Sequence, residues 1–175
     1  MAWLQSFHLT FIVAAAALMV TAAINDARAF KIPNWIWITL LALFPLYGLS
    51  APHEVNWLHH FGIFAIILAI GFALFAGHFA GAGDVKLLAV AALWAGPNYI
   101  GVLLVMTGLT GGLLAVGYAL AAWLRHRKQP QAATTTEESH ASMMQALTKV
   151  AIPYGIAIAV GSLTAFGMMV TPILS

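Results

Sequence analysis

The sequence predicts an all-α polytopic membrane protein, a bundle of about six transmembrane helices. Of its 175 residues, 62% are hydrophobic and only 7% are charged, whereas about 25% are charged in an ordinary soluble domain. The mean hydropathy is +0.94. So few charges could not cover a water-facing surface of this size, so the exterior must lie largely in lipid.

Six apolar segments follow one another along the chain. A helix that crosses the membrane needs roughly 20 apolar residues, and about 17 suffice. We predict that the spans lie at 7–24, 32–49, 57–75, 84–95, 99–124 and 150–170. The chain is then one membrane-embedded domain, 1–175.

The fourth segment is shorter than a bilayer core is thick. About 12 residues at 1.5 Å each fall well short of the roughly 30 Å hydrocarbon layer. We therefore expect neighbouring helices to shield this segment, or the helix to extend back into 81–83. A re-entrant segment, which would leave five spans, is the alternative. Gly, Pro and Asn in 95–98 predict a turn before the fifth span.

The basic residues predict how the chain is oriented in the membrane. All seven Lys and Arg lie in three segments on one side of a six-span arrangement, 25–31, 77–86 and 125–149. The opposite loop, 50–56, contains Glu54 and no basic residue. Because positive charges gather in cytoplasmic loops, both termini are expected outside the cytoplasm. The basic pI of about 9.2 then reflects topology and not binding to nucleic acid.

One segment has the composition of a flexible loop. Small polar residues and two Glu fill 129–140, and such a segment cannot build a core. We predict a flexible cytoplasmic loop at about 125–149. The first span is read as a retained helix, because the basic residues of a signal peptide precede its apolar stretch, whereas here they follow it.

Several catalytic chemistries are excluded by the residues. The chain has no cysteine, which rules out a disulfide, a thiolate metal site and a cysteine nucleophile. The HExxH pattern of zinc proteases starts at His53, but Trp57 stands where the second His is needed. Ser162 lacks the second Gly of a nucleophile elbow. We therefore expect no metal and no cofactor.

Two aspartates remain as candidates, and they are the only Asp residues in the chain. Asp26 and Asp84 both lie where a span meets the inner face, where a carboxylate costs about 2 to 3 kcal/mol to place. They could be loop ends paired with Arg28 and Lys86. However, Lys86 is two residues from Asp84, a spacing at which helical side chains do not face one another.

The second interpretation is a pair of carboxylates that act together. Gly, Ala and Gly at 81–83 precede Asp84, and this run lets another backbone approach the carboxylate. Two carboxylates in a low dielectric would share one proton. One then acts as a general base on water, and the other protonates or polarises a carbonyl.

Both aspartate segments resemble the type IV prepilin peptidases. Segment 26–34, DARAFKIPN, is similar to the first aspartate motif of that family, and 81–86, GAGDVK, is similar to its GxGD motif. A further match is IPYG at 152–155. The resemblance covers nearly the whole chain. The six-span layout with little else resembles the short enzymes of tight-adherence (Flp) pilus systems.

The resemblance implies an intramembrane aspartic endopeptidase that acts in pilus biogenesis. Such an enzyme removes the basic leader of a prepilin or pseudopilin at the cytoplasmic face of the bacterial inner membrane, usually just after a Gly. Asp26 and Asp84 match the catalytic pair. The residues expected to bind substrate or shape the site are Gly81, Gly83, Lys86, Pro33, Asn34, His78, Pro153 and Tyr154. Methyltransferase activity is not implied, because the cysteine-bearing insert of the bifunctional members is missing.

A second function class stays open at this point. A small polytopic subunit or carrier could use the two Asp in a proton or ion path. A carrier is expected to place its ionisable residues near the middle of the bilayer, whereas these lie toward one face. The sequence leaves the oligomeric state open.

Overall fold

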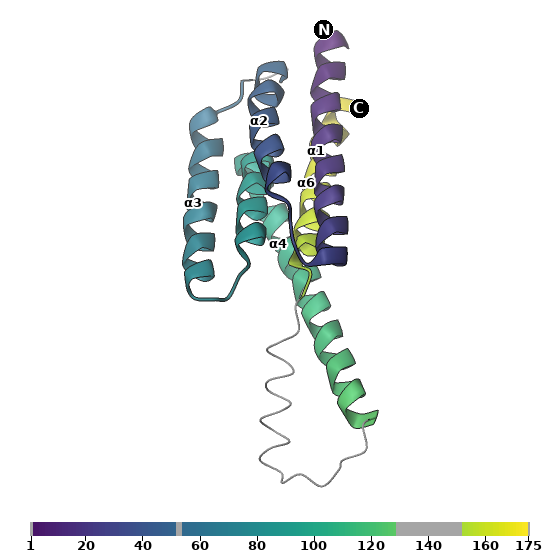
Figure 1. The fold of residues 1–175 in the computed structure, drawn as a ribbon. Coiled ribbons are helices and arrows are strands. Elements are labelled where there is room, and N and C mark those ends of the chain that lie inside the picture. The colour runs from purple at the N-terminus through teal and green to yellow at the C-terminus, as the bar shows by residue number, and fades with distance from the viewer. Residues whose placement is uncertain (1, 52–53, 129–151, 175) are drawn as a thin grey trace.

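The computed structural model describes residues 2–51, 54–128 and 152–174. This part of the chain is helical and contains no strand, which confirms the predicted all-α bundle (Figure 1). The helices are α1 (Ala2–Ala29), α2 (Asn34–Ser50), α3 (Trp57–Ala76), α4 (Ala82–Lys128) and α6 (Tyr154–Leu174). The predicted loop at 125–149 falls mostly on 129–151, outside the described residues.

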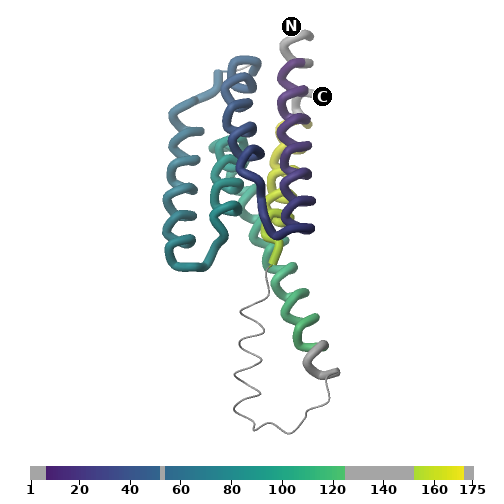
Figure 2. Tube along the Cα trace, in the orientation of Figure 1, coloured from purple at the N-terminus to yellow at the C-terminus, as the bar shows by residue number. Residues whose placement is uncertain are grey.

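Helix α4 is two helices joined by a sharp turn at Gly96. This residue has φ 60° and ψ −171°, a conformation that glycine adopts far more readily than other residues. Pro97, which has no N–H to satisfy, suits the first turn of the helix that follows. We call 82–95 the first arm and 97–128 the second arm. In Figure 2 the tube turns back at this point, as the sequence predicted.

The first arm of α4 is the central helix of the bundle. Val85, Leu87 and every residue of 89–95 are buried, and α4 contacts α2, α3 and α6. The indole N–H of Trp94 donates to the Leu40 carbonyl at 3.0 Å. Both expectations for this short span are therefore met, since the helix starts at Ala82 and its neighbours enclose it.

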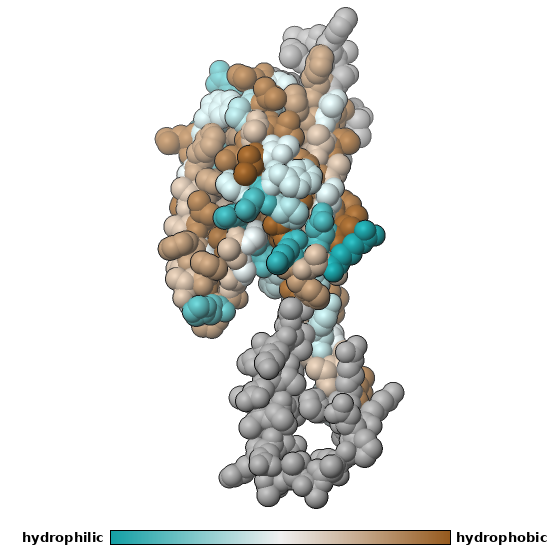
Figure 3. Space-filling model, viewed as in Figure 1, coloured by the Kyte–Doolittle hydropathy of each residue, from teal (hydrophilic) through white to brown (hydrophobic). Residues whose placement is uncertain are grey.

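The surface and the helix lengths indicate a membrane protein. Four described helical stretches are long and apolar enough to cross a bilayer, namely Phe7–Ala29, Trp57–Ala76, Ala82–Leu124 and Tyr154–Thr171. Helix α2 is a shorter apolar helix. Counting the two arms of α4 separately, the bundle has about six spans. On the face that Figure 3 shows, apolar residues cover much of the helical bundle, and most of the strongly hydrophilic ones lie in its lower half.

Of the helix boundaries that differ from the predicted spans, two bear on the aspartates. Helix α1 continues to Ala29, so Asp26 lies on the helix and not in the connection after it. Helix α6 begins at Tyr154, because Ile152 and Pro153 before it are not helical. The start of α1 and the end of α6 lie at the same end of the bundle (Figure 1), as an even number of crossings requires.

Candidate active site

Asp26 is held by the beginning of another helix. Its side chain is 5% exposed, and its Oδ2 accepts a hydrogen bond from the backbone N–H of Gly155 at 2.7 Å. The first N–H groups of a helix have no partner within it and carry partial positive charge. The start of α6 is therefore a ready binding site for this carboxylate.

A glycine at position 155 is required for this contact. A Cβ there would lie 2.9 Å from Oδ2 and 3.0 Å from the Cβ of Asp26. The site-residue prediction included Pro153 and Tyr154 but missed Gly155. The available signal was the IPYG sequence at 152–155, in which the glycine sits in the first turn of a helix.

Asp84 is held by its own helix. It is the third residue of α4, and its carboxylate accepts a hydrogen bond from the backbone N–H of Gly81. The Val85 N–H donates to the Gly81 carbonyl at 3.1 Å, which makes Gly81 the N-cap. Such a return from the third residue to the cap is half of a capping box. A Cβ on Gly81 would lie 2.8 Å from Oδ2 of Asp84.

The two carboxylates are near enough to interact electrostatically. They come from segments 58 positions apart in sequence. The structure brings them together at the end of the bundle where α1 ends and α4 begins. Within the described residues, no group of three or more His, Asp or Glu could hold a metal ion.

The basic residues of the two aspartate segments point elsewhere than to the carboxylates. Lys86 Nζ lies 5.4 Å from the centroid of the Trp37 ring, a cation–π contact. Arg28 and Lys31 are exposed. Among the residues that the structure describes, no ion pair joins Asp26 or Asp84 to a basic side chain. The interpretation of the aspartates as salt-bridged loop ends is therefore not supported.

The rest of the first motif shapes the entry into α2. Pro33 occupies the N-cap position with φ −60°, and its carbonyl accepts from the Ile36 N–H at 3.2 Å. The Asn34 Oδ1 accepts from the Trp37 indole N–H at 3.3 Å. Pro33 and Asn34 thus fix the start of the helix whose Trp37 contacts Lys86.

Gly83 lies against the connection between α1 and α2. A Cβ at position 83 would lie 3.3 Å from the Cβ of Ile32. The sequence suggested that another backbone approaches here, whereas the nearest neighbour is the Ile32 side chain. The contact links the second aspartate motif directly to the first, because Ile32 lies within segment 26–34.

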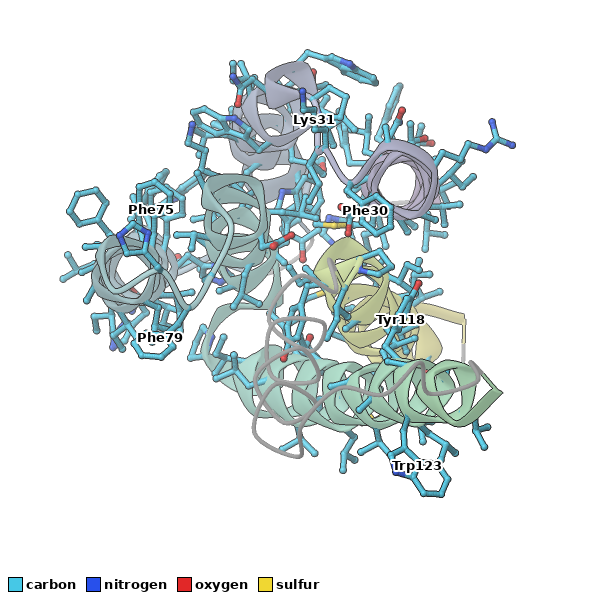
Figure 4. The ribbon with its side chains drawn as sticks, turned by 60° about the horizontal axis from the view of Figure 1, so that its bottom comes forward. Phe30, Lys31, Phe75, Phe79, Tyr118 and Trp123 are labelled. Carbon is cyan, nitrogen blue, oxygen red and sulfur yellow. The ribbon has the colours of Figure 1, made fainter. Side chains whose placement is uncertain are left out.

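Two bulky residues near the aspartates adopt left-handed backbone conformations. Phe30 has φ 50° and His78 has φ 62°, values that favour glycine. The Phe30 N–H donates to the Asp26 carbonyl at 2.9 Å, which closes the last turn of α1. Figure 4 looks toward this end of the bundle, with Phe30 beside α1 and Phe79 below α3.

His78 performs the corresponding task at the end of α3. Its N–H donates to the Phe75 carbonyl at 2.9 Å, and the Phe79 N–H donates to the Leu74 carbonyl at 2.9 Å. These two bonds form a Schellman motif, whose left-handed residue is usually glycine. His78 is thus an exposed residue in a position of backbone strain.

A cavity of about 800 Å³ opens beside Asp84. It is formed by α3, both arms of α4 and the start of α6. Of the predicted site residues, it is lined by His78, Gly81, Asp84 and Tyr154. The remaining predicted site residues are not part of its lining: Asp26, Pro33, Asn34, Gly83, Lys86 and Pro153.

The comparison with protein families identifies the chain. Residues 12–116 match the type IV leader peptidase family. The match covers Asp26, Asp84 and the first arm of α4, and it ends before α6. No curated protein and no solved structure matches. Because the match spans more than half of this chain of membrane helices, the protein belongs to the type IV leader peptidase family and is a membrane peptidase.

Proposed function

We propose that this peptidase is an intramembrane aspartic endopeptidase that removes the leader of a type IV or Flp-type prepilin or pseudopilin. Asp26 and Asp84 are its catalytic residues, and water is the nucleophile. The observation that carries the proposal is the convergence of two carboxylates, each fixed by a backbone N–H, beside a cavity large enough for a peptide segment.

The chemistry follows from the closeness of the two carboxylates. Like charges in a low dielectric cannot both ionise cheaply, so the pair holds one proton between them. The ionised carboxylate takes a proton from water while the oxygen of that water bonds to the scissile carbonyl carbon. The protonated carboxylic acid polarises that carbonyl. As the C–N bond breaks, the leaving amine takes up a proton and the pair returns to its starting state.

The two anchors prepare this geometry before substrate arrives. Each carboxylate accepts one backbone hydrogen bond, from Gly155 in one case and Gly81 in the other. Fixed orientation of reacting groups supplies a large share of enzymatic rate enhancement. Asp84 lines the cavity and Asp26 does not, so Asp84 is the residue that meets the substrate peptide first.

The active site faces the cytoplasm of a bacterial inner membrane in this proposal. The residues 28, 31 and 86, all basic, lie in the two segments that carry the aspartates, and positive residues favour the cytoplasmic side. A basic leader is held on that side by the same rule. The aspartates therefore lie where the leader leaves the bilayer.

The direct test uses the purified protein in liposomes. The substrate is a prepilin with a basic leader that ends in Gly, and the product is identified by mass spectrometry. We expect one cut, immediately after that Gly, without any added metal or cofactor. Absence of cleavage by folded protein, or cleavage within the membrane-spanning part of the prepilin, would contradict the proposal.

A further inference from the structure

Helix α3 contacts the bundle with only a small part of its surface. It lies at the edge of the bundle (Figure 1) and has one buried residue, Gly71. A Cβ at that position would lie 2.5 Å from a methyl carbon of Val85, so the glycine brings α3 close to the first arm of α4. This apolar helix of 20 residues leaves most of its side chains to lipid or to a partner within the membrane.

Part of this free surface faces the cavity that contains Asp84. Three residues of α3 line the cavity at a spacing that places them on one face of the helix: Ile67, Gly71 and Leu74. A second wall is the second arm of α4, with Leu104 and Gly108. Leu74 is 46% exposed and Leu104 is 40% exposed, so both walls keep exposed apolar surface.

The cavity extends along the bundle from the aspartate end. Asp84 lies where α4 begins, beside the end of α3. From there the lining continues along α3 through Leu74 to Ile67, and seven residues of helix rise roughly 10 Å. On the first arm it continues from Val85 to Leu88. The cavity is therefore a mostly apolar groove that leads from Asp84 toward the end of the bundle where α1 starts (Figure 1).

The size of the groove fits a helix. Its volume is about 800 Å³, and two turns of a helix about 10 Å wide occupy roughly 800 Å³. Gly108 keeps one wall flat, because an added Cβ there would have no atom within 4 Å. Small residues on a membrane helix let another helix approach closely. The groove thus suits an apolar helical segment about two turns long.

The proposed reaction places such a helix in the direction of the groove. The basic leader of a prepilin lies on the cytoplasmic side of the cut, and the membrane-spanning part lies on the other side. When the scissile bond is at Asp84, the apolar residues that follow it extend away from the cytoplasm, as the groove does. Helices associate in lipid through close packing, which a wall with a glycine allows.

We propose that the groove between α3 and the second arm of α4 binds the apolar transmembrane segment of the prepilin, which enters sideways from the lipid. This inference rests on the proposed peptidase function and adds the place at which the substrate helix docks. Leu74, Leu104 and Gly108 are substrate-binding residues. They hold the helix so that the peptide bond before it lies at the aspartates, and they transfer no proton.

Cross-linking in liposomes tests the docking directly. The parent has no cysteine, so Leu74→Cys and Leu104→Cys each present one thiol, in an Asp84→Asn background that leaves the prepilin uncut. The prepilin carries one Cys in the second turn of its apolar segment, and copper phenanthroline oxidises neighbouring thiols to a disulfide. We expect a disulfide-linked product from both positions.

The matched controls lie on the same two helices. Phe72 and Leu109 are 66% exposed but do not line the cavity, because their helical spacing from Leu74 and Leu104 places them on other faces. Phe72→Cys and Leu109→Cys should therefore give little disulfide-linked product with the same prepilin.

A filled groove should exclude the substrate helix. Gly108→Leu adds a side chain inside the cavity, and its Cβ meets no atom within 4 Å, so the thermal midpoint should stay parental. We expect kcat/KM for the prepilin to fall at least about tenfold, because overfilling an apolar contact weakens it by about that much. The disulfide yield at Leu74→Cys should fall with it. Gly112→Leu, equally open on the same helix but outside the cavity lining, should stay parental in both.

The outcomes separate the two proposals. Parental kcat/KM in Gly108→Leu would overturn the docking site and leave the peptidase proposal intact. Equal disulfide yields at the lining and control positions would mean that the groove holds only lipid, and would overturn the docking site as well. No cleavage by the parent would overturn the peptidase proposal and, with it, the docking site.

Discussion

Asp26 and Asp84 are held in opposite ways. Asp26 depends on a distant segment, because its partner Gly155 lies 129 positions away on another helix. Asp84 depends on its own first turn, because its carboxylate returns to Gly81 three residues earlier. One carboxylate is fixed by tertiary packing and the other by local helix capping, yet each is bound by the N-terminus of a helix.

Because they are held differently, the two aspartates should be displaced by different mutations. The position of Asp26 should respond to any change in the packing of α1 on α6, including changes far from it in sequence. The position of Asp84 should respond mainly to changes in 81–83. The same arrangement, a carboxylate at a helix N-terminus, is thus formed by a long-range contact for Asp26 and by a short-range contact for Asp84.

Among the glycine substitutions, the largest effect on this comparison is expected from Gly155→Val. The new Cβ would lie 2.9 Å from Asp26 Oδ2, so the carboxylate must move. A displacement of about 1 Å at a catalytic group costs on the order of 100-fold in rate, and we expect at least that loss of kcat/KM. The rate is measured with purified protein and a prepilin in liposomes.

The matched control is Gly167→Val on the same helix, where no atom lies within 4 Å of an added Cβ. It should insert, accumulate and cleave like the parent. If Gly155→Val also cleaved at the parental rate, the start of α6 would not position Asp26.

A smaller loss is expected from Gly83→Val. Its Cβ would lie 3.3 Å from the Cβ of Ile32, a milder overlap than the 2.9 Å contact at position 155, so Ile32 need shift by only a few tenths of an ångström. We expect roughly a tenfold loss of kcat/KM, with normal membrane insertion because Val is well tolerated in a bilayer. Gly112→Val, in open space on the same helix, is the control. Equal rates for both variants would remove the close-approach argument.

A gain in stability is expected from His78→Gly. The left-handed conformation of His78, φ 62°, costs about 1 kcal/mol that glycine does not pay, so the thermal midpoint should rise. The cleavage rate should stay near parental if the residue only ends α3. If the protein is stabilised but loses most of its activity, the imidazole of His78 takes part in the reaction.

A labelling experiment tests whether the two aspartate segments face the same side of the membrane, and it leaves both aspartates unchanged. The parent has no cysteine, so single variants Lys31→Cys, His78→Cys and Glu54→Cys each present one thiol. Lys31, beside the first motif, and His78, beside the second, should react with an impermeant reagent only from the cytoplasm. Glu54 should react only from outside. If positions 31 and 78 were labelled from different sides, the two aspartates would lie at opposite faces of the membrane and could not act as a pair.

Local sequence patterns predicted the spans well. Apolar length placed the helices and the Gly-Pro pair marked the turn at Gly96, because membrane helices must satisfy their own backbone. The helix ends were predicted less accurately, since α1 continues to Ala29 and α6 begins at Tyr154. The length of the fourth span also predicted its burial, since a helix too short for the bilayer needs protein around it.

The long-range contacts of the site were beyond local patterns. The Gly155–Asp26 bond joins residues 129 positions apart, and the contact between Gly83 and Ile32 depends on how the connection after α1 packs on α4. The strained residues Phe30 and His78 were hidden for another reason, because no glycine marks either position. Both residues end a helix, where local backbone hydrogen bonds hold a left-handed residue whatever its side chain.

The most direct measurement of the central claim is a mutant cycle on the two aspartates. The parent, Asp26→Asn, Asp84→Asn and the double variant are compared for cleavage of one prepilin in liposomes. Asn keeps a carbonyl oxygen that can accept from Gly155 or Gly81, but it cannot exchange a proton. Each single variant should insert normally and lose at least about 1,000-fold in rate, and the double variant should lose no more. A single variant that cleaves near the parental rate would contradict the account.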